Sequence, residues 1–140
     1  GIFQIAPKAY GLKAFELGGR GSVEAVKIAN PNRINVTAYA VRGDGYLFVT
    51  IINKTHGPGS REAEVAILGD GVTLHAEDIF LTAPNGDVTT RAGVTLGGAP
   101  IPNDGPWLGK WTALPPDTTG QCVVKVAAAS AAIARMALEK

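Results

Sequence analysis

Short apolar stretches separated by glycine and proline are the feature that most limits what this chain can fold into. The 140 residues include 18 Gly and 9 Pro, and these are spread between the stretches rather than gathered in one segment. Such punctuation is typical of an all-β protein with many turns. The expected strands cover residues 34–41, 45–54, 63–68, 74–82 and 121–126. Their number and spacing predict a two-sheet antiparallel β-sandwich.

The first two expected strands are apolar on both faces. In the second, Leu47 and Val49 alternate with Phe48 and Thr50, so both faces of the strand carry apolar side chains. This pattern predicts central strands that pack one side against a second sheet. The four residues that begin at Arg42, Arg-Gly-Asp-Gly, predict a tight hairpin turn because glycine accepts the positive φ that such turns need.

Two segments do not fit a purely β pattern. The first is predicted to be a short amphipathic helix that starts at Pro7 and ends before the glycine pair after Leu17, with Tyr10 and Ala14 on its apolar face. The second, residues 127–140, is rich in alanine and has high helix propensity. Its residues also alternate with a period of two, so composition and pattern point to different structures. The Gly-rich residues 94–101 are expected to be irregular, and the Pro-rich residues 100–116 to form a long loop.

Composition excludes several classes of partner. The formal net charge is +1 and only 18% of residues are charged, which provides no electrostatic basis for binding nucleic acid or an anionic membrane. Hydrophobic residues make up 46%, yet no apolar run is long enough to span a bilayer. The single cysteine, Cys122, lies in an apolar run and is expected to be a small buried side chain. A chain without disulfides is compatible with the cytosol as well as with export.

The acidic and histidine residues give little support for catalysis or metal binding. A glycosidase needs two opposed carboxylates. Most acidic residues here lie in turn-like contexts, and the one adjacent pair, Glu77 and Asp78, would point to opposite faces of a strand. The only histidines, His56 and His75, show no metal-ligand spacing. We therefore expect no catalytic residue, no metal site and no cofactor in this chain.

Two tryptophans in a polar loop, Trp107 and Trp111, are the most distinctive local feature. A flat aromatic face can stack on a sugar ring, so the pair is a candidate sugar-binding site. A tryptophan also buries a large area while its N–H finds a partner, so both rings can instead close the end of the core. A third interpretation is contact with a neighbouring domain, and the sequence leaves all three open.

Several segments together resemble the C-terminal region of clan A glycoside hydrolases. They are the helix-like start at 6–15, the hairpin segments at 36–41 and 47–54, the Trp-Leu-Gly-Lys-Trp loop at 107–111, and the ending at 129–136. The group that they resemble most is family 79, the β-glucuronidase and heparanase-like enzymes, and families 30 and 39 are similar. In that pattern the ending at 129–136 is a closing strand, so the resemblance favours a strand over a helix there.

The resemblance implies an accessory role. Residues 1–20 would correspond to the end of a catalytic barrel, and residues 21–140 to a β-sandwich that packs against and stabilises that barrel. The family's catalytic carboxylates lie on barrel strands that this chain does not match, so no catalytic residue is carried over. The implied partner is a (β/α)8 barrel of the same polypeptide, and an oligosaccharide is a second candidate. The alternative is a carbohydrate-binding module that uses Trp107 and Trp111. The resemblance also implies a secreted or periplasmic protein.

Overall fold

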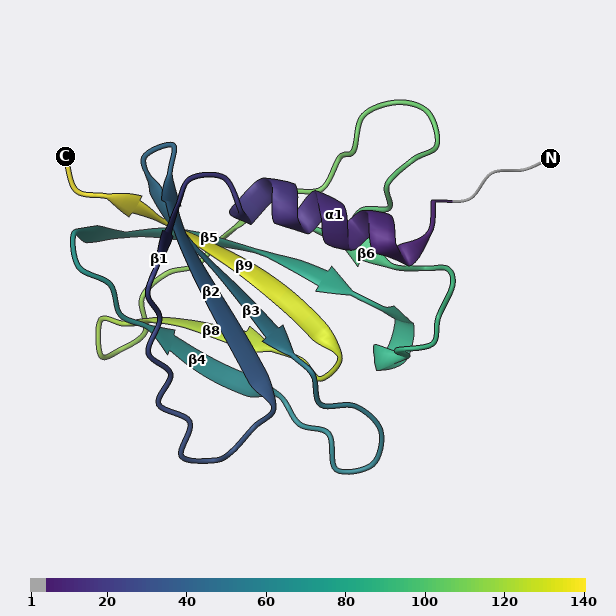
Figure 1. Cartoon of the computed structure of the whole chain (residues 1–140), viewed down its shortest axis with the longest axis horizontal. Coiled ribbons are helices and arrows are strands. Elements are labelled where there is room, and N and C mark those ends of the chain that lie inside the picture. The colour runs from purple at the N-terminus through teal and green to yellow at the C-terminus, as the bar shows by residue number, and fades with distance from the viewer. Residues whose placement is uncertain (1–4) are drawn as a thin grey trace.

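In residues 5–140, which the computed structural model describes, nine strands form two antiparallel sheets and one α-helix lies across the outer face of the larger sheet (Figure 1). The predicted fold class, an all-β sandwich with one short N-terminal helix, is confirmed. The elements are α1 (Pro7–Gly18), β1 (Ser22–Glu24), β2 (Val36–Gly43), β3 (Tyr46–Asn53), β4 (Ala63–Ile67), β5 (Val72–Thr82), a 3-10 turn (Pro84–Gly86), β6 (Thr95–Leu96), β7 (Thr112–Ala113), β8 (Cys122–Val126) and β9 (Ser130–Leu138).

The larger sheet has the order β1-β2-β3-β9-β5-β6, and β7 also pairs with β5. β4 and β8 form the second sheet. The last strand in sequence, β9, is thus central in the larger sheet, because it pairs with β3 on one side and with β5 on the other. Every residue of β9 from Ser130 to Ala137 faces a partner on β3, so this strand depends on contacts from distant parts of the chain.

The β2–β3 hairpin forms where the glycine-containing motif predicted it. The last pair of the ladder joins Gly43 to Tyr46, which leaves Asp44 and Gly45 as a two-residue loop. Both loop residues have positive φ, 52° and 81°. This is the geometry of the type I′ turn, whose twist matches that of the flanking strands. The hairpin holds β3 in register with β2 and places the two faces of β3 in two different cores.

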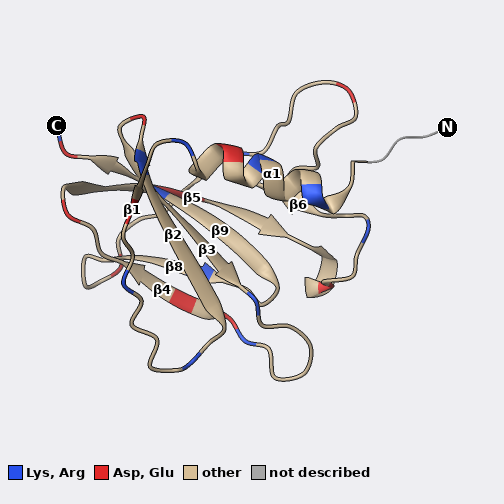
Figure 2. Cartoon of the chain, viewed as in Figure 1, with Lys and Arg blue, Asp and Glu red and all other residues tan. Residues whose placement is uncertain are grey.

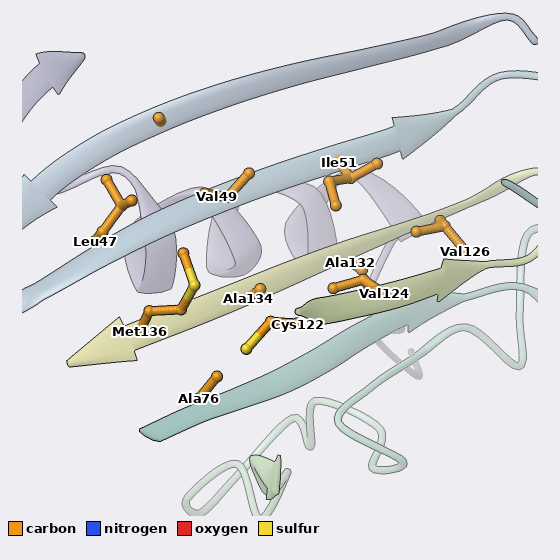
Figure 3. Close-up of a cluster of buried hydrophobic side chains, with 11 residues drawn as sticks. Leu47, Val49, Ile51, Ala76, Cys122, Val124, Val126, Ala132, Ala134 and Met136 are labelled. Carbon is orange, nitrogen blue, oxygen red and sulfur yellow. The ribbon is translucent and has the colours of Figure 1, made fainter. Parts of the chain in front are cut away.

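The first core lies between the two sheets (Figure 3). Figure 3 shows Val49 and Ile51 of β3 on the same side of the sheet as Val124 and Val126 of the second sheet. Ile51, Val124 and Val126 have no exposed surface. Burying a side chain of this size contributes about 1.5–3 kcal/mol to folding. Cys122 belongs to the same cluster and is 4% exposed, so its expected role as a small buried side chain is confirmed.

The second core lies on the opposite face of the larger sheet, beneath α1. Tyr10 and Ala14 of the helix pack there with Phe48, Ile79 and Ile133 of the sheet, and Leu17 lies at the margin of the cluster. The predicted helix face is confirmed. The sandwich therefore has three layers, which are the β4-β8 sheet, the larger sheet and α1.

Some elements differ from the sequence-based expectations. β1 was not predicted, because its three residues carry almost no hydrophobic signal and pair with β2 only after the chain turns back at Gly21. β2 begins at Val36, two residues later than expected. The expected long loop 100–116 contains the two-residue strand β7.

The second sheet covers only part of the inner face of the larger sheet. Beside β4 a groove of about 670 Å³ remains, lined by Val36 and Ala38 of β2, by Val65 and Ile67 of β4, and by the segment 24–30. Among the described residues β4 pairs with β8 alone, so its other edge faces this groove.

Candidate functional site

The candidate site is built on the outer layer, where α1 and the tryptophan-containing loop meet the larger sheet. Tyr10 fixes the helix to this loop, because its hydroxyl accepts a hydrogen bond of 3.0 Å from the backbone N–H of Ile101. At the other end of the helix, Gly18 lies so close to the sheet that a Cβ there would be 2.9 Å from Ile133 Cγ2. The helix is thus held tightly at both ends by the residues beneath it.

The opposite side of α1 is open. Leu12 and Phe15, three residues apart and therefore on neighbouring positions of one helix face, are 68% and 71% exposed. We call these two side chains the outward face of α1. Glu16 on the same helix is ion-paired at 2.9 Å with Lys13 of the helix and with Arg20, two residues beyond the end of the helix. Lys13 holds the pKa of Glu16 below its usual value. An apolar centre beside ionised residues has the composition of a protein–protein contact surface.

Trp107 lies half-buried against the second core, beside the helix. Its indole N–H donates a hydrogen bond of 3.0 Å to the carbonyl of Leu96. The ammonium of Lys13 lies 5.5 Å from the ring centroid. Gly109 packs directly on the ring, since a Cβ at this position would be 1.9 Å from Cζ2 of Trp107. These contacts hold the ring in place and use its only hydrogen-bond donor.

Trp111 is also half-buried, and one of its faces is covered by a cation. The guanidinium carbon of Arg135 lies 4.2 Å from the Trp111 ring centroid and 5.1 Å from that of Tyr46. The same guanidinium is paired with Glu77, with 2.6 Å between Nη2 and Oε2. We call Tyr46, Trp111, Glu77 and Arg135 the arginine cluster.

The structure does not bring the two tryptophans together into one bare platform. Each ring has a cation near it and packs at the margin of the core, while part of each ring remains accessible to solvent. The arginine cluster was not found from the sequence, because Glu77 and Arg135 are 58 positions apart. One local signal did mark Arg135 as a residue that needs a partner, since it is the single charged residue of β9.

Four acidic residues, Glu77, Asp78, Asp87 and Asp117, occupy the positions that their sequence contexts predicted. Glu77 points to the outer face, whereas Asp78 is 7% exposed and belongs to the strand position that faces the second sheet. Burial raises the pKa of Asp78. Asp117 instead caps a turn, and the hydroxyl of Thr119, which donates to it at 2.7 Å, lowers the pKa of this carboxyl. Asp87 caps its own turn in the same way.

Within residues 5–140, no group of three or more His, Cys, Asp or Glu side chains is placed to hold a metal ion. No helix in the same range is long and apolar enough to cross a membrane. In Figure 2 the positions of Lys and Arg alternate with those of Asp and Glu along the loops, the helix and the strands. Burial, and secondarily the charge of Asp117, raises the pKa of the Cys122 thiol.

No family model matches this sequence, and no curated protein matches it. A search of solved structures finds a GH30 endoxylanase from Clostridium papyrosolvens C71 with a TM-score of 0.54 and 18% sequence identity. The match covers 94% of this chain and 28% of the endoxylanase chain. At this identity the likeness concerns the fold alone. Almost the whole of this chain is therefore similar in fold to a region of just over a quarter of a GH30 endoxylanase chain.

Proposed function

We propose that this chain is the non-catalytic β-sandwich accessory domain of a glycoside hydrolase. In this proposal residues 21–140 form the accessory domain, and residues 1–20 belong to the end of a (β/α)8 barrel of the same polypeptide. The observation that carries the proposal is the fold match, in which nearly all of this chain corresponds to a minor part of a glycoside hydrolase chain. The sequence motifs at 6–15 and 107–111 support the same relationship.

The outward face of α1 is the proposed contact with the barrel. Leu12 and Phe15 are both more than two-thirds exposed, although the other face of the helix is well packed. Large apolar side chains that are exposed together often mark an interaction site. A helix that packs one face on the sandwich and the other on a barrel would bury all of these residues.

The arrangement of the acidic residues supports a non-catalytic role. Retaining and inverting hydrolysis both need two carboxyl groups that converge on one bond, at roughly 5–5.5 Å or 6.5–9.5 Å from each other. Glu77 is already paired with Arg135, and Asp78 lies on the other face of the same strand. Asp87 and Asp117 are used by their own turns. We expect the isolated chain to hydrolyse no aryl glycoside.

A second candidate function is sugar binding. It is favoured by one observation, namely that half-buried Trp111 and Glu77 both contact Arg135. The side chain of Glu77 is 40% exposed, and both of its bonds to Arg135 use the same carboxylate oxygen, which leaves the other oxygen for a hydroxyl group. In this case the domain would carry a weak oligosaccharide site as well as its structural role.

The decisive experiment is to determine the coding sequence upstream of Gly1. The proposal expects a (β/α)8 barrel with two catalytic carboxylates on its strands, and an unrelated upstream sequence would overturn it. In the full-length protein, Leu12→Asp and Phe15→Asp should lower the melting temperature and the activity together. Leu68→Asp is the matched control, because Leu68 is 78% exposed but follows β4 in the layer opposite α1. In the isolated chain, none of the three substitutions should lower the melting temperature appreciably.

A further inference from the structure

Two Asn-x-Thr tripeptides lie side by side at one end of the larger sheet. They are Asn35-Val36-Thr37 and Asn53-Lys54-Thr55. Val36 pairs with Asn53 across the β2–β3 ladder, and the backbone N–H of Lys54 donates a 2.9 Å hydrogen bond to the carbonyl of Asn35. An Asn-x-Ser/Thr tripeptide without proline in the middle is the acceptor pattern for an N-linked glycan. The two copies differ in what the fold does with the asparagine side chain.

The side chain of Asn53 is buried in the interior of the protein. It is 1% exposed, and its amide nitrogen donates to the carbonyls of Arg61 and Val126, both at 2.9 Å. Its oxygen accepts bonds from the backbone N–H of Thr55 at 3.1 Å and from the hydroxyl of Thr55 at 2.7 Å. A glycan on this nitrogen would remove one of its two donors and would place a sugar in the closed space at the end of the first core. The folded protein therefore has no room for a glycan at Asn53.

Asn35 has the opposite environment. Its side chain is exposed and takes part in none of the hydrogen bonds found in residues 5–140. Its backbone carbonyl accepts the hydrogen bond from Lys54, at the point where the chain enters β2. In Figure 1 the start of β2 lies at the lower end of the sheet, away from α1. A bulky group on Asn35 would therefore neither disrupt the β2–β3 ladder nor cover the outward face of α1.

We infer that Asn35, and not Asn53, is the N-glycan acceptor of this chain when it passes through a secretory pathway that contains an oligosaccharyltransferase. The co-reactant is an oligosaccharide linked to a lipid through a diphosphate. The amide nitrogen of Asn35 forms a bond to C1 of the first sugar, and the bond from C1 to the diphosphate oxygen breaks. The lipid diphosphate leaves with the electron pair, and the nitrogen loses one proton. Nothing is oxidised or reduced.

A glycan at this position would have a physical effect on the surface around it. The preceding segment exposes Val26 and Ile28, which are 39% and 51% accessible, and Ile28 lines the groove together with Ile34, the residue before Asn35. N-linked glycans are bulky and solubilising. Glycosylated protein should therefore stay in solution at higher concentration than the same protein after enzymatic removal of the glycan.

The test is secretion of the whole 140-residue chain from eukaryotic cells behind a cleavable leader. The glycan is then removed with a peptide-N-glycosidase in heavy-oxygen water, which marks each formerly glycosylated Asn as a heavy Asp in the mass spectrum. We expect the mark at Asn35 and not at Asn53. Asn35→Gln and Thr37→Ala should abolish it, whereas Thr37→Ser should preserve it. Secreted protein that carries the mark at Asn53, or that lacks it at Asn35, would overturn the inference.

A second measurement does not depend on folding or secretion. Translation of the Asn53→Gln variant in the presence of microsomes leaves Asn35 as the remaining acceptor. We expect one glycan, seen as a single decrease in gel mobility that the glycosidase reverses. The absence of this decrease would overturn the assignment of Asn35, whether or not the variant folds.

Discussion

Glu77 and Arg135 lie directly opposite one another on β5 and β9, and Nε and Nη2 of Arg135 lie 2.8 and 2.6 Å from the same carboxylate oxygen of Glu77. The guanidinium also lies over the rings of Tyr46 and Trp111. This one pair thus connects two central strands to the tryptophan-containing loop. It is partly solvated, since the side chains are 25% and 40% exposed for Arg135 and Glu77 respectively.

The first prediction concerns the energy of this pair. A double-mutant cycle with Glu77→Gln and Arg135→Met should give a coupling energy of about 0.5–1 kcal/mol in urea unfolding, because solvent screens a partly exposed ion pair. The coupling should weaken as salt is added. Arg135→Lys should keep most of the charge interaction but lose the planar stacking on Trp111. Zero coupling at low salt would contradict the prediction.

The second prediction concerns the close approach of Gly109 to Trp107. Gly109→Ala would place a methyl group 1.9 Å from Cζ2 of Trp107 and 2.4 Å from the carbonyl oxygen of Leu96, so the ring must move. We expect a loss of about 1–3 kcal/mol in the free energy of unfolding and a shift in tryptophan fluorescence. Gly11→Ala is the matched control, since nothing lies within 4 Å of its added methyl group and the residue is in α1. The control should be more stable than the unsubstituted chain by about 0.5–1 kcal/mol.

The third prediction is a pH dependence centred on Asp78. Burial raises the pKa of this carboxyl above its ordinary value of 3.8, so the folded state favours the protonated form. The sign follows from linkage: stability from this group is greatest below pH 3.8 and is lost as the pH rises through the folded-state pKa. Asp78→Asn should therefore stabilise the protein at neutral pH, and its advantage should shrink toward pH 3 (about one unit below the ordinary pKa). Melting temperatures of the two proteins across this range measure the effect, and an Asn variant that is less stable at pH 7 would contradict it.

The fourth prediction separates the structural role of the tryptophans from a role in sugar binding. Trp111→Ala should lower the free energy of unfolding by about 2–3 kcal/mol, because it removes a large ring from the margin of the second core. Trp107→Phe should cost about 1 kcal/mol through loss of the hydrogen bond to Leu96. Calorimetric titration with glucuronide- and xylose-containing oligosaccharides should show at best weak binding. Micromolar binding abolished by Trp111→Ala, in a variant that remains folded, would instead favour the carbohydrate-binding module.

The sequence alone predicted the elements whose signals lie within a few neighbouring residues. The β2–β3 hairpin was predictable because Asp44 and Gly45 suit the positive φ of its turn, and α1 because Pro7 and the glycines after Leu17 bound an apolar helix face. The acidic residues were also predictable, since Asp87 and Asp117 are held by bonds to residues two positions away. The proposed partner, and the role of Trp107 and Trp111 in sugar binding, remain predictions.

The last strand, β9, shows where prediction from local composition fails. By composition alone β9 favours a helix, yet Ile133, Ala134 and Met136 are almost completely buried in a strand. The alternating pattern and the family resemblance both favoured the strand, and the structure supplies the physical reason. A helix there would leave β3 and β5 without their shared partner, and the backbone hydrogen bonds on both sides outweigh a propensity difference of a few tenths of a kcal/mol per residue.

By itself, then, the sequence determined the fold class, the hairpin, the helix and the burial of Cys122, because each depends on turn chemistry or periodicity within a few residues. The tertiary structure decided the position of β9 between β3 and β5, the pairing of β1 with β2, and the cluster that brings Glu77 and Trp111 onto Arg135. It also decided that Asn53 is buried while Asn35, beside it in the same sheet and in the same kind of tripeptide, is exposed. These features depend on contacts between residues far apart in the chain, and no local pattern specifies which of those residues meet.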